Sequence, residues 1–89
     1  MTDEPVPVPV EGTLDLHAFA PRDVASVVDE YVTATHEAGL REVRFIHGRG
    51  IGVQRGLVQR ALEQHPLVAE FWDAAESHLG ATIARLTHP

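Results

Sequence analysis

The chain has 89 residues, a net charge of −6, a pI near 5.3 and no cysteine. This length suits one small domain with a single hydrophobic core. The absence of cysteine excludes disulfides and thiolate metal sites, and the acidic balance argues against non-specific binding of nucleic acid, which depends on cationic side chains. The sequence contains neither a stretch apolar enough to cross a membrane nor a secretory signal pattern, so we expect a cytoplasmic protein.

Residues 1–10 are predicted to form a flexible tail, because alternating proline and valine at 4–9 favours an extended polyproline conformation. A strand is predicted next, over 10–17, with Leu14 and Leu16 facing the core. Asp15 and His17 then share the opposite face, two residues apart. The carboxylate can orient or charge the imidazole there, or both side chains can simply belong to an exposed polar face.

A helix is predicted from Pro21 to about residue 38, followed by a strand over 41–46. A strand, a helix and a second strand with this spacing indicate a right-handed crossover between parallel neighbours. The two strands end next to His17 and His47, so both histidines are expected at the same carboxyl edge of the sheet. Open α/β sheets bind their ligands at such edges.

The stretch His47-Gly48-Arg49-Gly50-Ile51-Gly52 is the strongest candidate for a binding loop. Alternating glycines let a ligand reach backbone N–H groups, and the start of a following helix favours an anion such as phosphate. Arg49 adds a guanidinium next to the imidazole of His47. A tight turn between a strand and a helix can also need glycines for purely structural reasons.

Positive charge is concentrated around this stretch. All seven basic residues are arginine, and five of them fall within residues 41–60 beside a single acid, Glu42, so that this window carries a net charge of +4. Arginine binds phosphate through its planar guanidinium, although a composition that replaces lysine with arginine would produce the same count. We expect Arg55 to bind phosphate together with Arg49.

A second helix is predicted over 54–64, a strand over 67–72, a loop over 73–79 and a final strand over 80–86. Trp72 lies in the third strand. Its side chain can stack on a nucleic-acid base, but a lone tryptophan in a small domain more often lies in the core, and we expect it there.

Taken together, these motifs resemble the Smr (small MutS-related) domain family over roughly residues 12–86, within a predicted domain at 11–87. The resemblance rests on four stretches: Leu14-Asp15-Leu16-His17, Gly39-Leu40-Arg41-Glu42-Val43, His47-Gly48-Arg49-Gly50-Ile51-Gly52 and Gly80-Ala81-Thr82. It implies an α/β fold, specifically a two-layer sandwich of order β-α-β-α-β-β with a mixed four-stranded sheet, similar to the C-terminal domain of translation initiation factor 3.

The resemblance also implies binding of DNA or RNA and endonuclease activity, in DNA repair, recombination, mismatch repair or RNA processing. By position, the catalytic residues would be Asp15, His17 and His47, and the phosphate-binding residues Gly48, Arg49, Gly50, Gly52 and Arg55. Cleavage of DNA would require Mg²⁺ or Mn²⁺, for which Asp15 and the histidines offer few ligands. Ala18 and Ile51 depart from the family pattern, which leaves a non-catalytic nucleic-acid or phosphate-binding module, or a protein-interaction domain, as alternatives.

Overall fold

The computed structural model describes residues 12–48, 52–74 and 80–88; the tail at 1–10 lies outside these ranges. The described residues follow the predicted order of strand, helix, strand, helix, strand and strand. The elements are β1 (Thr13–Asp15), α1 (Pro21–Glu37), β2 (Glu42–Ile46), α2 (Val53–Gln64), β3 (Val68–Asp73) and β4 (Ala81–Leu86).

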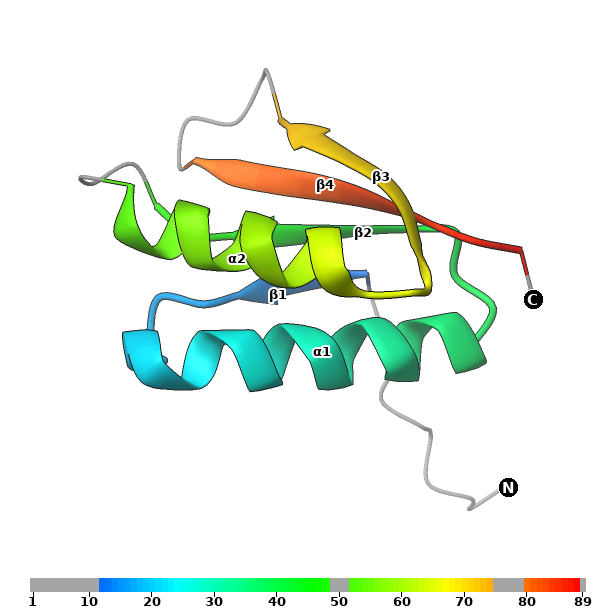
Figure 1. Ribbon diagram of the computed structural model, residues 1–89, viewed down its shortest axis with the longest axis horizontal. Helices are drawn as coiled ribbons and strands as arrows, with labels where there is room; N and C mark the ends of the chain where they lie inside the picture. Colours follow the sequence, from blue (N-terminus) through cyan, green and yellow to red (C-terminus); the bar gives the residue numbers. More distant parts are fainter. Residues whose placement is uncertain (1–11, 49–51, 75–79, 89) are drawn as a thin grey trace, which may run out of the picture.

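The four strands form one mixed sheet in the order β1-β2-β4-β3. β1 and β2 are parallel, as a crossover through α1 requires, whereas β4 runs antiparallel to both β2 and β3. Figure 1 shows α1 and α2 side by side along the sheet, which makes the second layer. The predicted two-layer α/β sandwich is therefore confirmed.

One hydrophobic core joins both helices to one face of the sheet. Phe45 is fully buried in its centre and meets Tyr31 of α1 edge to face, with ring centroids 5.7 Å apart. Both helices contribute to the same cluster, so they cover the same face. The buried members are Leu16, Val24, Val28, Val32, Val43, Phe45, Val58, Leu62, Ala84 and Leu86.

The first strand is shorter than predicted, because it ends at Asp15 instead of continuing to His17. Leu16 still donates its N–H to the carbonyl of Ile46 at 2.9 Å, but its own carbonyl accepts the N–H of Phe19 at 3.0 Å. The chain therefore turns directly after Leu16. His17 lies in this turn and not on the face of a strand.

The prediction that Trp72 lies in the core is wrong, since its side chain is 40 % exposed. Trp72 pairs with Ile83 in the register of β3 and β4, whereas Phe71 packs against the core. Side chains alternate between the two faces of a strand, so only one of these adjacent aromatic residues can face the helices. Phe71 takes that position, and Trp72 lies on the face that the helices leave uncovered.

His65 connects the two helices where α2 ends. Its Nδ1 accepts the N–H of Leu67 at 3.1 Å, which leaves the proton of the neutral ring on Nε2, 3.1 Å from Oδ1 of Asp29 in α1. Asp29 is exposed, and its carboxylate also holds the buried ring of His65 in place.

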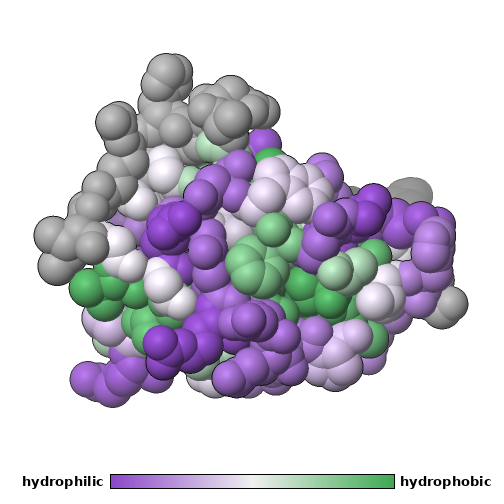
Figure 2. All heavy atoms as spheres, turned by 45° about the horizontal axis from the view of Figure 1, so that its top comes forward, coloured by the Kyte–Doolittle hydropathy of each residue, from purple (hydrophilic) through white to green (hydrophobic). Residues whose placement is uncertain are grey.

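Figure 2 shows that hydrophilic residues cover most of the visible face, with apolar residues in small groups between them. In the described ranges, no helix combines the length and the apolar character that crossing a membrane requires.

Phe45→Ala should lower the free energy of unfolding by about 3–5 kcal/mol, because the substitution removes a fully buried ring and leaves a cavity. Chemical denaturation of both proteins measures this loss. Phe19→Ala is the matched control, since the same change is made at a side chain that is 37 % exposed, and it should cost clearly less. Equal losses at the two positions would contradict the core described above.

Candidate nucleic-acid site at the carboxyl edge of β1 and β2

The parallel pairing of β1 with β2 brings the two histidine motifs to one edge of the sheet. Asp15 is opposite Ile46 in this pairing, so the turn that holds His17 and the residue His47 both follow directly from paired positions. The sequence-based prediction of a shared edge is confirmed. Gly48 continues from the same edge, and Gly52 begins α2.

Asp15 shapes the turn that carries His17. Its Oδ1 accepts the backbone N–H of His17 at 2.9 Å, a side chain to backbone bond that favours a turn. The contact of Asp15 is therefore with the His17 backbone, whereas the sequence predicted an effect on the imidazole. His17 itself is exposed at this edge.

Gln54, in the first turn of α2, ties the His17 turn to the glycine stretch. Its side-chain Nε2 donates to the carbonyl of Phe19 at 3.1 Å and to that of Leu16 at 3.4 Å. Gln54 is not among the residues predicted from the sequence, because a glutamine in an amphipathic helix carries no recognisable signal. The first turn of α2, which follows the glycine stretch, is thus joined directly to the His17 turn.

The glycine stretch uses the conformations for which glycine is suited. Gly48 has φ of +87° and Gly52 has φ of +88°, in the left-handed region that side chains disfavour. Gly52 is also the residue that precedes the first turn of α2, whose N–H groups carry partial positive charge. Arg49, Gly50 and Ile51 lie outside the described residues, so the contacts with phosphate predicted for Arg49 and Gly50 remain predictions.

His47 is buried, with 8 % of its surface exposed, and both of its ring nitrogens have partners. Nδ1 lies 3.0 Å from the carbonyl oxygen of Gly48, and Nε2 lies 2.9 Å from the hydroxyl of Thr82 in β4. The two predicted catalytic histidines therefore have different environments: His17 is open to solvent and His47 is packed into the edge of the core.

Thr82 connects His47 to a polar network on α2 and β3. The Nε2 of Gln59 donates to the hydroxyl of Thr82 at 3.1 Å and to Oδ1 of Asp73 at 3.0 Å. Arg55 donates to both carboxylate oxygens of Asp73, at 2.9 Å and 2.7 Å. The closing Gly80-Ala81-Thr82 stretch was the one sequence signal for this network, whereas Gln59 and Asp73 gave none.

The ion pair of Arg55 and Asp73 shifts the pKa of both side chains. The hydrogen bond from Arg55 holds the pKa of Asp73 below its usual range, helped by the charge of Arg55 and by Gln59 and opposed by burial. The same hydrogen bond and the charge of Asp73 raise the pKa of Arg55. The guanidinium that was predicted to bind phosphate is thus already engaged by a carboxylate.

The described residues do not fit a dedicated divalent-cation site. Within them, no group of three or more histidine, aspartate or glutamate side chains is placed to hold a metal ion. Among the described carboxylates at this edge, Asp15 is bonded to the backbone of His17, and Asp73 is bonded to Arg55 and Gln59. A step that uses Mg²⁺ or Mn²⁺ would therefore have to draw ligands from the substrate phosphate and from water as well as from these side chains.

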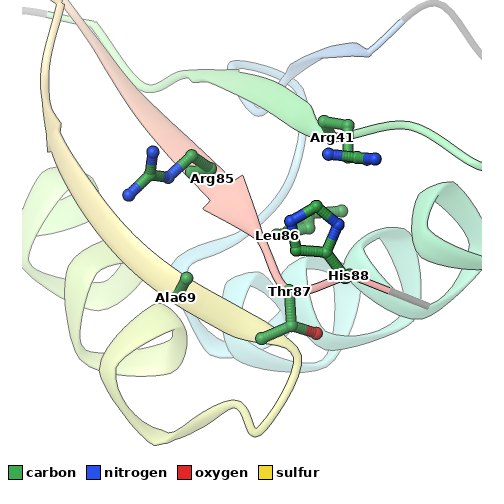
Figure 3. Close-up of a pocket in the computed structure, with 6 residues that line it drawn as sticks. All are labelled: Arg41, Ala69, Arg85, Leu86, Thr87 and His88. Carbon is green, nitrogen blue, oxygen red and sulfur yellow. The ribbon is translucent and has the colours of Figure 1, made fainter.

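A hollow of about 420 Å³ lies at the opposite edge of the sheet, where β2 begins and β4 ends. It is lined by Arg41, Ala69, Arg85, Leu86, Thr87 and His88. Arg85 is paired with Glu70, and Figure 3 shows its guanidinium turned away from Arg41 and His88. The cationic groups do not converge, so this hollow is a weaker candidate than the edge that carries the two motifs.

Comparison with known proteins agrees with this geometry. A family model described as the Smr domain matches residues 14–87. The endonuclease MutS2 of Caldicellulosiruptor saccharolyticus is 37 % identical over 79 residues, which cover 86 % of this chain and 10 % of that protein. The endonuclease MutS2 of Thermomicrobium roseum is 34 % identical over 80 residues, with the same coverage. The chain thus spans about a tenth of the length of these relatives.

Solved structures show the same fold. The crystal structure of the Smr domain of Thermus thermophilus MutS2 superposes with a TM-score of 0.78 at 27 % identity, covering 84 % of this chain and 96 % of that one. YdaL, a stand-alone small MutS-related protein from Escherichia coli, also gives a TM-score of 0.78, at 24 % identity and covering 88 % of this chain and 66 % of that one.

Asp73→Asn should lower the melting temperature at neutral pH by a few degrees at most, because the Arg55–Asp73 pair is about half exposed. Since folding lowers the pKa of Asp73, the pair stabilises the fold above about pH 4 and this contribution is lost as the pH falls below that value. Melting curves of both proteins between pH 7 and pH 3 should therefore converge at the acidic end.

Glu63→Gln is the control for that series, because it removes one negative charge from an exposed position of α2, the helix that carries Arg55. Its melting curve should follow the wild type at every pH. A difference between wild type and Asp73→Asn that stays constant down to pH 3 would contradict the ion pair as its source.

Proposed function

Because the chain belongs to the Smr domain family, we propose that it binds nucleic acid at the carboxyl edge of β1 and β2 and cleaves its phosphodiester backbone there. The observation that carries the proposal is the meeting of the two motifs at this edge. The His17 turn and His47 come directly after the paired ends of β1 and β2. Gln54 joins the His17 turn to the first turn of α2, which follows the glycine stretch. An exposed imidazole thus lies at the same edge as the glycine-rich stretch to which the proposal assigns anion binding.

The phosphate would be held mainly by the backbone. In the proposal, N–H groups of the glycine stretch and the first turn of α2 bind the phosphate oxygens, and Arg49 adds a charged donor. Although the whole chain carries −6, the window at 41–60 carries +4 around this stretch. Arg55 can join these contacts only by exchanging Asp73 for a phosphate oxygen.

RNA suits this set of residues, because its 2′-hydroxyl supplies the nucleophile. In the proposed reaction His17 takes the proton of the 2′-hydroxyl, and the 2′-oxygen forms a bond to phosphorus. The bond from phosphorus to the 5′-oxygen breaks, and water at this exposed edge returns a proton to the leaving oxygen. The first proton transfer is placed on His17, and not on the buried His47, because His17 is exposed.

DNA lacks that hydroxyl, so its cleavage needs activated water and a divalent cation. The described residues do not provide such a site. The relatives that the chain resembles are nevertheless named endonucleases, and supercoiled DNA therefore belongs in the test as the second substrate. The cytoplasmic location expected from the sequence stays a prediction.

A non-catalytic binding module is the second candidate function. Two observations favour it: Ala18 follows His17 where the family pattern has glycine, and both ring nitrogens of His47 are occupied. The same edge would then bind nucleic acid without cutting it. A protein-interaction domain is the third reading, and it predicts no binding of nucleic acid at low salt.

His17→Ala should reduce cleavage of labelled single-stranded RNA by about 10²- to 10⁴-fold, the usual contribution of a positioned acid or base. Binding measured by gel shift should remain, because the glycine stretch and the arginines are unchanged. The full chain is incubated with RNA and with supercoiled plasmid, each with and without Mg²⁺ or Mn²⁺.

His88→Ala serves as the matched control, since it removes an exposed histidine from the opposite edge of the sheet and should leave cleavage at the wild-type level. Binding without cleavage by the wild type would support the module instead. The nucleic-acid readings both fail if neither substrate is bound at low salt.

A further inference from the structure

The contacts of His47 assign its protons. The oxygen 3.0 Å from Nδ1 is the carbonyl of Gly48, which can only accept a hydrogen bond, so Nδ1 carries a hydrogen. The group next to Nε2 is the Thr82 hydroxyl, which can donate or accept. The protonation of Nε2 therefore depends on what else Thr82 does.

Thr82 is itself an acceptor from a third element. Its oxygen receives a hydrogen bond from Nε2 of Gln59, and the remaining amide hydrogen of Gln59 goes to Asp73, which Arg55 holds. The Thr82 hydroxyl can then give its own hydrogen to Nε2 of His47. Every donor in the chain from Asp73 to Gly48 has an acceptor if the ring is neutral with its hydrogen on Nδ1. With a doubly protonated ring, the Thr82 oxygen would accept from both His47 and Gln59, and its own hydrogen would have no acceptor among these contacts.

The ring also fixes the first residue of the glycine stretch. The N–H of Gly48 donates to the carbonyl of Gly80 at 3.1 Å, while the carbonyl of Gly48 accepts from the ring of His47. Gly48 has φ of +87°, a conformation that glycine permits but does not enforce. The bonds at its N–H and at its carbonyl hold it there. The direction in which the chain leaves the sheet edge is set by these two bonds.

We infer that His47 is a positioning residue, and that Thr82 and Gln59 hold its imidazole neutral so that it fixes Gly48 for phosphate binding. The inference rests on the proposed function, because that function is what assigns phosphate binding to Gly48. In this inference His47 holds Gly48 in place and does not transfer a proton. Thr82 and Gln59 then join the residues on which cleavage depends. His17 remains the one histidine of the two motifs that exchanges protons with the substrate.

The direct test is the nitrogen spectrum of the imidazole rings in the full-length ¹⁵N-labelled protein at neutral pH, without nucleic acid. We expect His47 with a protonated Nδ1 and an unprotonated Nε2. A ring with the hydrogen on Nε2, or a doubly protonated ring, would overturn the inference. This readout does not require activity, so it stands or fails separately from the proposed nuclease.

A pair of variants at position 82 tests the role of the hydroxyl. Thr82→Val has nearly the same shape but no hydroxyl and should lower RNA cleavage by about 10- to 100-fold, the scale of a small misplacement at a reacting site. Thr82→Ser keeps the hydroxyl, so its cleavage rate should stay within about 3-fold of the wild type, a much smaller change than misplacement would cause. The ring of His47 should keep its hydrogen on Nδ1 in this variant. Loss of cleavage in the folded serine variant would overturn the role given to the hydroxyl.

His47→Asn separates support from proton transfer. The asparagine amide can donate to the Gly48 carbonyl in place of Nδ1 but cannot act as an acid or base at neutral pH. We expect His47→Asn to retain at least 10-fold more cleavage than His47→Ala. If His47 carried a proton in the reaction, both variants would instead lose cleavage by about 10²-fold or more. Equal, near-complete loss in both variants would assign proton transfer to His47 and overturn the inference.

Discussion

The parallel pairing of β1 with β2 is the constraint on which the rest of the site depends. Two strands that run the same way end at the same edge, so the residues after Asp15 and after Ile46 must emerge together. The crossover through α1 makes this pairing, and the helix is held by apolar residues at steps of four along one face, namely Val24, Val28 and Val32. The core that stabilises the fold is therefore also what brings the two histidine motifs together. Gln54 then joins the His17 turn to the first turn of the helix that follows the glycines.

A second consequence of the fold is that it places polar side chains inside the edge of the core. The register of β2 against β4 puts Thr82 opposite Phe45, on the face that the helices cover. A buried hydroxyl in that place needs partners, because an unsatisfied polar group is costly away from water. His47 and Gln59 are those partners, and no buried polar side-chain atom in the described part of the chain lacks one. The network from Arg55 to Gly48 thus meets a requirement of the core and, at the same time, holds Gly48, the first glycine of the stretch.

Much of this could be predicted from the sequence, because the periodicity of apolar residues is a local signal. The order of elements, the helix start at Pro21 and the shared edge of His17 and His47 all followed from spacing. The end of β1 did not, since it depends on the Asp15 carboxylate capturing a backbone N–H. Trp72 was misplaced because two adjacent aromatic residues compete for one face, and sequence alone does not show which wins. His47 bonds to Thr82 of β4 and Arg55 bonds to Asp73 of β3, and contacts between such distant segments leave no mark in a single sequence.

The central claim is that nucleic acid binds at the carboxyl edge of β1 and β2. The most direct measurement is the change in backbone amide signals of the ¹⁵N-labelled chain as a short single-stranded RNA is added at low salt. We expect the largest changes at His17, Gly48 and Gly52, and in the first turn of α2, with little change around Arg41 and His88 at the opposite edge. Changes centred on that opposite edge, or on the face that carries Trp72, would contradict this account of the site.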